Sequence, residues 1–457
     1  MPGAANNSAK CPSEPLAELL AAPGTYALDT ETDYAGDPNW NLLLVQIGTR
    51  DEAWVFDARH LIDDPSCRRL FTELLMSPDH TWVMHNSSFD LQYLRHHFGV
   101  VPPNVEDSMA LALCLTESIS HIGLKYLARR HLNAGFYEAE VNEEKIGPKN
   151  PMSNLDPNVL AKYGAWDVIY TRQLWDLLNE LVKAEGNRSL YEGLLREAQK
   201  EFAEIEYAGV LVDEAQGLRA KREMQAQLKP LIKQIQSIAA QVGFHPSEVV
   251  KNARPNDAFN PLSPKQRMNL FYEKLNMKKA WAPNSKTKQL QLTTGEEFYK
   301  ENKGSVVATL AEDIYHIQKM DSTYVTGIHK FLHPDKRVRP SILLAGARTG
   351  RVAMRNPPMQ TIPHDSTVDG GDQGNRYDFS SIKSQFIAPP GYVFMEADYS
   401  ALELYIAYDL SGDPNIILAL RTDDFHVKAA SDAYEIPRDR VTEKIRCLLY
   451  TSDAADE

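Results

Sequence analysis

YALDTE, residues 26–31, decides the fold of the first part of this chain, because an apolar run there ends in two acids, Asp29 and Glu31. On a β-strand, residues two apart point to the same face, so both carboxylates can meet one cation. Further apolar segments predict strands at LLLVQIGT (42–49), EAWVFDA (52–58) and HTWVMH (80–85), and helices at about 66–76, 87–97, 108–116, 121–131 and 156–184. The first three strands follow one another as a meander, and strands interleaved with helices are typical of an α/β sheet.

After about residue 186 the chain becomes mostly helical. The predicted elements are a helix that ends at Gly209, a strand VLVD (210–213), helices over 214–240 and about 305–332, and exposed irregular structure over 250–300, which is rich in Pro, Asn, Lys and Thr. Pro230 predicts a kink in the first of these two long helices. A last apolar segment, YVFMEAD (392–398), predicts a strand that leads into a helix over 400–410.

Composition limits the class of protein. The 457 residues are 43% hydrophobic and 24% charged, which is ordinary for globular proteins and predicts two to four domains. No apolar stretch approaches the roughly 20 residues that span a bilayer. The N-terminus lacks the pattern of a signal peptide. The four cysteines form no CxxC pair, so we expect reduced thiols, no structural zinc and a cytoplasmic location without a membrane.

The net charge of −13 argues against nucleic-acid binding, but the uneven distribution of the charges along the chain weakens that argument. Residues 1–190 carry 15 basic and 26 acidic side chains, whereas residues 191–457 carry 34 and 36. This division fits a carboxylate-lined, metal-binding module joined to a part that tolerates polyanions. A solvated acidic surface is the alternative interpretation of the same charges.

Three further residues join the first two acids. Asp90 lies just inside a predicted helix, where an acid alone would only complement the helix dipole. Tyr163 and Asp167 are four residues apart, so they share a helix face. Four carboxylates from a strand, a helix start and a later helix are what a two-metal phosphodiester hydrolase needs, since hard cations such as Mg²⁺ prefer oxygen ligands. The tyrosine hydroxyl could hold the attacking water in line.

The segments LDTET (28–32), HNSSFD (85–90) and YGAWD (163–167) resemble, in this order, the three motifs of the DEDDy 3′–5′ exonucleases, which have a ribonuclease H-like fold. The resemblance implies two bound Mg²⁺ or Mn²⁺ ions. The metal ligands that it implies are Asp29, Glu31, Asp90 and Asp167. It further implies that Tyr163 orients the nucleophilic water and that Asn86 and Phe89 position the substrate.

Several later segments resemble family A DNA polymerases of the bacterial polymerase I type, whose work is DNA replication and repair. They are EFAEIEYAGVLVD (201–213), FNPLSPKQRMNLFYEKL (259–275), ARTGRVAMRNPPMQTIP (347–363) and IKSQFIAPPGYVFMEADYSALEL (382–404). In the last of these, an apolar strand would deliver Asp398 to a sheet end, where a carboxylate suits Mg²⁺ bound to a nucleoside triphosphate.

The polymerase resemblance also implies roles for single residues. Asp398 and the carbonyl of Tyr399 would bind the catalytic metal, and Glu403 would exclude ribonucleotides. The residues that would contact the DNA duplex are Arg351 and Gln360, and those that would meet the incoming dNTP are His426 and Arg446. The sequence departs from the family pattern at Thr361, at Ala401 and at Val352-Ala353-Met354, which we expect to alter contacts to the duplex rather than the chemistry.

The largest departure from the family follows Arg446. Tyr450 stands where the family has a lysine, and the second aspartate of the polymerase site is missing. We therefore expect a truncated or misjoined reading frame, with residues 447–457 foreign to the family, and doubtful polymerase activity in this chain.

The predicted fold is an α/β ribonuclease H-like exonuclease domain followed by a mostly helical thumb and an incomplete α+β polymerase palm. The predicted parts are a tail (1–24), the exonuclease domain (25–185), the thumb with connecting segments (186–340), a partial palm with the start of the fingers (341–446) and a non-family tail (447–457). We expect a monomer, bacterial or phage-encoded, that acts on single-stranded 3′ ends and primer–template DNA. The alternatives are a DEDDy ribonuclease that acts on RNA 3′ ends and a catalytically silent nucleic-acid-binding fragment.

Overall fold

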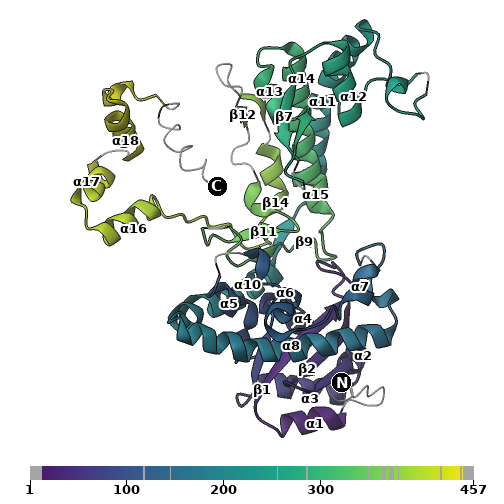
Figure 1. Ribbon diagram of the computed structural model, residues 1–457, viewed down its shortest axis with the longest axis vertical. Helices are drawn as coiled ribbons and strands as arrows, with labels where there is room; N and C mark the ends of the chain where they lie inside the picture. The colour runs from purple at the N-terminus through teal and green to yellow at the C-terminus, as the bar shows by residue number, and fades with distance from the viewer. Residues whose placement is uncertain are drawn as a thin grey trace. The chain divides into compact units, whose positions relative to one another are not determined.

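The structure is a computed structural model. It describes residues 13–116, 119–144, 146–254, 256–284, 287–347, 349–362, 367–369, 375–378, 380–422, 425–442 and 445. The chain divides into two compact units, Met1–Pro390 and Gly391–Glu457 (Figure 1). The segment 447–457, predicted to be foreign to the family, lies outside the described residues, as does Arg446.

A five-stranded mixed sheet organises the first part of the larger unit. Its strands, in spatial order, are β3 (Ala53–Asp57), β2 (Leu42–Gly48), β1 (Thr25–Thr32), β4 (Thr81–Met84) and β5 (Val105–Asp107). The first three strands in the chain pair antiparallel, whereas β4 and β5 join the sheet in parallel. The predicted meander of three strands and the mixed α/β architecture are therefore confirmed.

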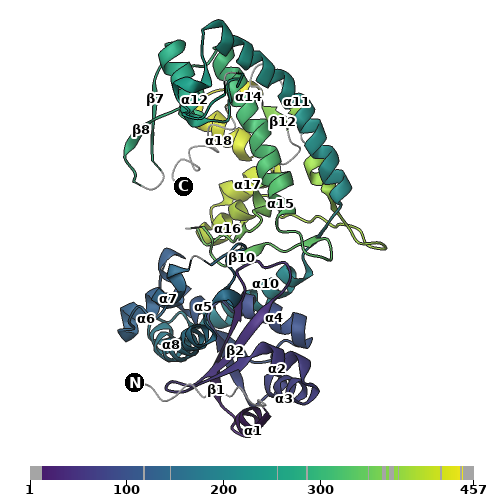
Figure 2. The same ribbon diagram turned by 90° about the vertical axis from the view of Figure 1, so that its right-hand side faces the viewer.

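Helices cover both faces of this sheet, as Figure 2 shows for β1 and β2. The helices of this part are α1 (Ser13–Leu20), α2 (Ala58–Asp63), α3 (Pro65–Met76), α4 (Ser87–Phe98), α5 (Ser108–Leu113), α6 (Leu124–Leu132), α7 (Ala139–Glu143), α8 (Pro157–Ala184), α9 (Arg188–Leu190) and α10 (Arg196–Ala208). One core contains Leu28 of β1 with residues of α1, α3 and α4, and another contains Ala27 of β1 with residues of α8. Since side chains alternate along a strand, Asp29 and Glu31 lie on the same face as Ala27, toward α8.

The structure differs from the predicted N-terminal tail, 1–24. Residues Ser13–Leu20 form helix α1, whose Leu16 and Leu19 are buried against α3. Two leucines three residues apart share a helix face, and packing of this face against the domain stabilises a helix that is too short to be stable alone.

A helical part follows the short strand β6 (Val210–Val212). Helix α11 (Glu214–Gln241) continues through Pro230 and packs against α14 (Val306–Met320), which leads through a π turn to α15 (Thr326–His329). The expected irregular structure over 250–300 is wrong in part. Regular elements there are α12 (Pro264–Met268), β7 (Ala280–Pro283), β8 (Leu290–Thr293) and α13 (Glu296–Glu301). They form because buried aromatic side chains, among them Phe271 and Phe298, supply a core beneath the polar surface.

Short strands connect this helical part to the rest of the larger unit. β6 pairs with β9 (Arg337–Val338) and with β14 (Phe386–Ile387). Two antiparallel pairs accompany them, β10 (Ser341–Leu343) with β11 (Ala353–Arg355) and β12 (Thr367–Asp369) with β13 (Asn375–Asp378).

The smaller unit contains α16 (Leu402–Ser411), α17 (Pro414–Thr422) and α18 (Phe425–Tyr434). The helix predicted over 400–410 is confirmed by α16. The strand predicted over 392–398 is wrong: these residues form neither strand nor helix, and Val393 and Met395 are 88% and 89% exposed. A strand needs hydrogen-bond partners, and no other segment of the described chain pairs with this one.

None of the helices in the described ranges has the length and apolar character needed to cross a membrane.

Candidate active site

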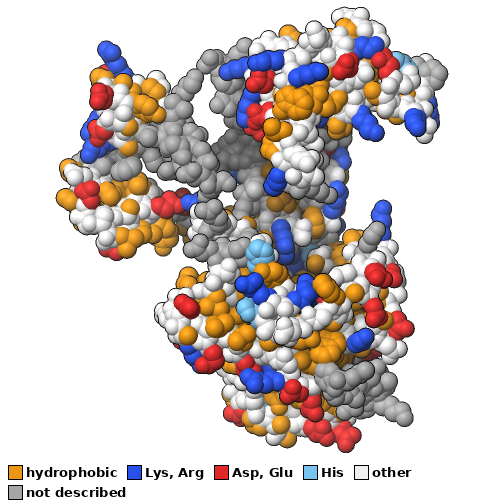
Figure 3. Space-filling model, in the orientation of Figure 1, with side chains coloured by type: hydrophobic (Ala, Val, Ile, Leu, Met, Phe, Trp, Pro, Cys, Tyr) orange, Lys and Arg blue, Asp and Glu red, His pale blue; other side chains and the backbone are white. Residues whose placement is uncertain are grey.

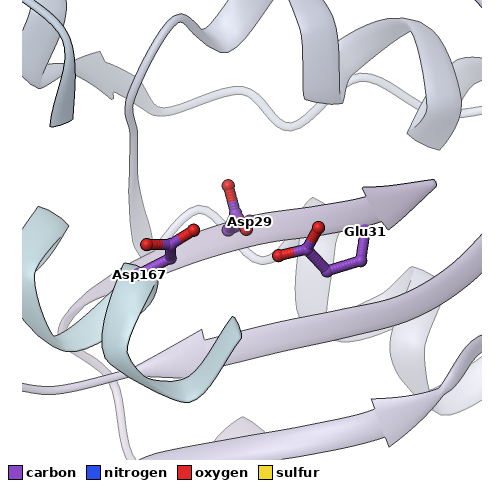
Figure 4. Close-up of side chains that lie close together, drawn as sticks. All are labelled: Asp29, Glu31 and Asp167. Carbon is purple, nitrogen blue, oxygen red and sulfur yellow. The ribbon is translucent and has the colours of Figure 1, made fainter. Parts of the chain in front are cut away.

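Three carboxylates from distant parts of the chain meet above the sheet (Figure 4). The ligand oxygens of Asp29, Glu31 and Asp167 all lie within 4.8 Å of one another. Asp29 and Glu31 project from β1, and Asp167 projects from α8 toward them. Asp29 is half-buried, and the other two are buried. The strand periodicity and the helix spacing in the sequence thus lead to one cluster.

Glycine allows α8 to approach the sheet closely enough to form this cluster. A Cβ atom on Gly164 would lie 2.4 Å from Nε2 of Gln46, a side chain of β2. Gln46 stands opposite Asp29 in the register of β1 and β2. A larger residue at position 164 would therefore displace the buried side chain of Gln46 or push the helix that carries Asp167 away from the strand that carries Asp29.

Asp90 lies beside the cluster but is not one of the three mutually close carboxylates. It projects from the first turn of α4 and is buried, and the hydroxyl of Thr30 donates a 2.6 Å hydrogen bond to its Oδ1. Burial raises the pKa of Asp90 to about 7, although this hydrogen bond opposes the rise. The negative charge of Asp90 acts in turn on Asp29.

The electrostatics of the cluster favour a bound cation. Burial and then the charges of the neighbouring carboxylates raise the pKa of Asp29 and of Glu31 well above their ordinary range. Oε1 of Glu31 is buried and has no hydrogen-bond partner among the described residues. Since a buried carboxylate oxygen without a partner is costly, this donor set fits a hard divalent cation, which takes oxygen ligands.

Tyr163 lies close to the same acids. It is one helical turn before Asp167, and it is half-buried. Burial, followed by the charges of Asp167, Glu31 and Asp29, raises the pKa of Tyr163, so its hydroxyl stays protonated near neutral pH. The predicted shared helix face of Tyr163 and Asp167 is consistent with this placement.

Two residues that the sequence analysis missed contact Asp167 directly. Nζ of Lys125, from α6, lies 2.5 Å from Oδ2 of Asp167. The hydroxyl of Tyr137, between α6 and α7, donates a 2.6 Å hydrogen bond to Oδ1. No local pattern reveals either residue, because neither belongs to a motif segment. For Lys125, the sequence offered one weak signal, its place in the otherwise apolar start of α6, LKYLARRHL.

Asn86 and Phe89 precede Asp90 in the chain but are not part of the cluster. Asn86 precedes α4 in the left-handed region, with φ 72°. Phe89 is half-buried and packs against Tyr93 in the core of the sheet. Asp107, which the sequence analysis also missed, fixes the start of α4 by accepting a 2.6 Å hydrogen bond from the backbone N–H of Ser87. The substrate-positioning roles of Asn86 and Phe89 stay predictions.

The residues predicted for the polymerase site are distributed over both units. In the larger unit, Gln360 accepts a hydrogen bond from the backbone N–H of Met354, and Arg351 lies in the exposed loop before β11. In the smaller unit, Asp398 and Tyr399 lie in the exposed segment before α16. Also in this unit, Glu403 belongs to the first turn of α16 and His426 to α18. Among the described residues of this unit, no group of three possible metal ligands forms.

Comparisons with known proteins cover most of the chain. Residues 9–183 match the family model described as 3′-5′ exonuclease, and residues 222–449 match the model described as DNA polymerase family A. A DNA polymerase I of Rhizobium leguminosarum is 25% identical over 80% of this chain and 33% of its own length. The DNA polymerase of Escherichia phage T5 is 25% identical over 91% of this chain and 49% of its own length.

A solved structure agrees in fold. The POL domain of Pol1 from M. smegmatis, in complex with DNA primer-template and dNTP, matches with a TM-score of 0.68 and 20% identity. The match covers 97% of this chain and 69% of that one. The chain spans about a third of the length of the first curated relatives that it matches. The two matched models and these relatives lead to one conclusion: the chain belongs to the family A DNA polymerases and carries a 3′–5′ exonuclease domain ahead of its polymerase part.

Proposed function

We propose that residues 25–185 form a ribonuclease H-like exonuclease that removes nucleotides from DNA 3′ ends with two Mg²⁺ or Mn²⁺ ions. The observation that carries this proposal is the convergence of Asp29, Glu31 and Asp167 within 4.8 Å. We assign Asp90 to the same site because its charge acts on Asp29, and because the hydroxyl of Thr30, the residue after Asp29, donates a hydrogen bond to it.

The carboxylates and the tyrosines of this site would have different roles. When bound, the divalent ions would activate water and stabilise the leaving oxygen. The carboxylates of Asp29, Glu31, Asp90 and Asp167 would hold these ions. The protonated hydroxyl of Tyr163 would orient the attacking water toward the phosphate. Tyr137 keeps Asp167 in place through its hydrogen bond.

We propose that the polymerase part binds primer–template DNA. Residues 214–340 carry 21 basic and 12 acidic side chains, and Figure 3 shows Lys and Arg side chains spread over the helices of this region. Such an excess of positive charge favours a polyanion. Arg351 and Gln360 would contact the duplex, and Glu403, His426 and Arg446 would act at the nucleotide.

We further propose that this 457-residue chain does not extend a primer by itself. In the described part of the smaller unit, Asp398 is exposed and belongs to no cluster of possible metal ligands. Two-metal nucleotidyl transfer needs more than one carboxylate around the ions. Incorporation of dNTPs that disappears in Asp398→Ala would contradict this proposal.

The exonuclease proposal is tested with a 5′-labelled single-stranded DNA and Mg²⁺ or Mn²⁺. We expect a ladder of products that shorten from the 3′ end and the release of mononucleotides. Asp29→Ala should abolish both, whereas Asp51→Ala, an exposed acid outside the cluster, should not. Degradation that Asp29→Ala leaves unchanged would falsify the proposal. An RNA of the same sequence separates a deoxyribonuclease from the ribonuclease alternative.

A further inference from the structure

We propose that Lys125 is the built-in counter-ion of the exonuclease metal site: it holds the carboxylates together when no divalent ion is bound, and it competes with that ion for Asp167. The inference rests on the proposed exonuclease function and adds a residue that sets the affinity of the site for metal ions.

The contact between Lys125 and Asp167 is close and shielded from water. Nζ lies 2.5 Å from Oδ2, the Asp167 side chain is 3% exposed and the Lys125 side chain is 27% exposed. The lysine charge also acts on Asp29 and Glu31, where it opposes the rise of their pKa values. One ammonium group therefore pairs with Asp167 and acts through its charge on the other two carboxylates of the cluster.

The cluster needs such a cation. Carboxylates held within a few ångströms of one another in a buried site repel strongly unless a positive charge offsets them. Among the ion pairs of the described residues, the pair with Lys125 is the one that involves an acid of this site. Lys125 thus occupies, in electrostatic terms, the position that a metal ion would take.

Aromatic side chains keep the ammonium at this position. Nζ of Lys125 lies 4.6 Å from the ring centroid of Tyr163 and 5.7 Å from that of Tyr137. Cations are attracted to such ring faces. The two rings therefore support the lysine beside the cluster whether or not it contacts Asp167.

Both oxygens of Asp167 are already engaged, Oδ1 by Tyr137 and Oδ2 by Lys125. A metal ion that uses Asp167 has to approach one of these oxygens, and at Oδ2 it meets the positive charge of Lys125. Lys125 is the partner that can leave, because its flexible stem reaches the partly exposed edge of the site. Metal binding and the contact between Lys125 and Asp167 therefore compete at Oδ2, because the two positive charges repel each other.

The first test measures Mn²⁺ binding at pH 8 by isothermal titration calorimetry, in an Asp398→Asn background that removes the polymerase acid. Lys125→Met should bind Mn²⁺ more tightly, by about tenfold, because one competing positive charge is lost. Lys125→Arg should stay close to the parent. Lys162→Met is the matched control, since Lys162 on α8 is 66% exposed and forms an ion pair with Glu140, outside the cluster.

The second test uses the unsubstituted protein and so does not depend on the folding of a variant. The rate at which an amine-reactive reagent modifies Lys125, followed by mass spectrometry, should rise several-fold when Mn²⁺ is added. The rate at Lys162 should not change.

The outcomes separate this inference from the proposed function. Equal or weaker Mn²⁺ binding by Lys125→Met, or unchanged reactivity of Lys125 in protein that binds Mn²⁺, overturns the counter-ion role. The absence of any Mn²⁺ binding that Asp29→Asn removes overturns the proposed metal site itself.

Discussion

The hydroxyl of Thr30 donates a 2.6 Å hydrogen bond to Oδ1 of Asp90 and so joins strand β1 to helix α4. Thr30 stands between Asp29 and Glu31 and points to the opposite face of the sheet. Strand β1 therefore carries Asp29 and Glu31 on one face, and Thr30 on its other face positions Asp90.

Thr30→Val should impair the exonuclease without unfolding the protein. Loss of a buried hydrogen bond costs about 1–2 kcal/mol, and Asp90 would lose the contact that opposes the rise of its pKa. We expect activity to fall and the pH–rate profile to move to higher pH, because Asp90 must be deprotonated to hold a cation. Thr25→Val on the same strand is the control. A profile with unchanged pH dependence would argue against the role of Thr30.

Tyr163→Phe should lower kcat by about tenfold to a hundredfold and leave Mn²⁺ affinity unchanged, because the hydroxyl acts on water and not on the ions. Single-turnover kinetics and calorimetry measure the two quantities. Tyr170→Phe is the matched control, since Tyr170 lies on the same helix but stacks on Trp166 with ring centroids 5.1 Å apart. Equal activity of Tyr163→Phe and the unsubstituted chain would remove Tyr163 from the mechanism.

Gly164→Ala should destabilise the exonuclease domain by about 1–3 kcal/mol, because the added methyl group would lie 2.4 Å from Nε2 of Gln46. We also expect weaker metal binding, since α8 carries Asp167. Urea unfolding gives the change in the free energy of unfolding. Gly193→Ala, where an added Cβ meets no atom within 4 Å, should be neutral or slightly stabilising. Similar stability of both variants would contradict the close approach.

We predict that Glu206 on α10 makes the free energy of unfolding depend on pH. It accepts hydrogen bonds from Gln92 on α4 and from the backbone N–H of Ile342 on β10, and burial raises its pKa from 4.5 to about 7. The folded protein then binds this proton more tightly than the unfolded chain. The free energy of unfolding should therefore fall, by up to about 3 kcal/mol, as the pH rises from about 4.5 to about 7.

Glu206→Gln tests this relation, because the amide resembles the protonated acid. Thermal unfolding at pH 5 and pH 8 should show a smaller loss of stability in Glu206→Gln than in the unsubstituted chain. Glu204→Gln, on the same helix but largely exposed, should show the full loss. If all three proteins lose equal stability, Glu206 does not carry a raised pKa.

Limited proteolysis should cut the chain first within residues 391–400. This segment has no regular structure, and its apolar side chains are exposed, including Val393 and Met395. Exposed irregular backbone is the preferred site of proteases. Chymotrypsin should yield a stable fragment that ends near Phe394 and retains exonuclease activity. First cleavage inside the sheet of the exonuclease domain would contradict the described structure.

The sequence determined the local geometry of the exonuclease site. The period of two along YALDTE placed Asp29 and Glu31 on one face, and the spacing of four placed Tyr163 and Asp167 on one helix face. These relations follow from backbone geometry alone, which is why the strands of the meander and most helices were predicted correctly. The family also followed from these motifs.

Only the tertiary structure brought Lys125 and Tyr137 to Asp167, because side chains far apart in sequence meet through packing and leave no periodic signal. The same reason explains the failure at 392–398. An apolar run with valine and aromatic residues favours a strand, but a strand forms only where another segment pairs with it. Local backbone preference therefore decided which faces carry the functional groups, and long-range packing decided which of these faces meet.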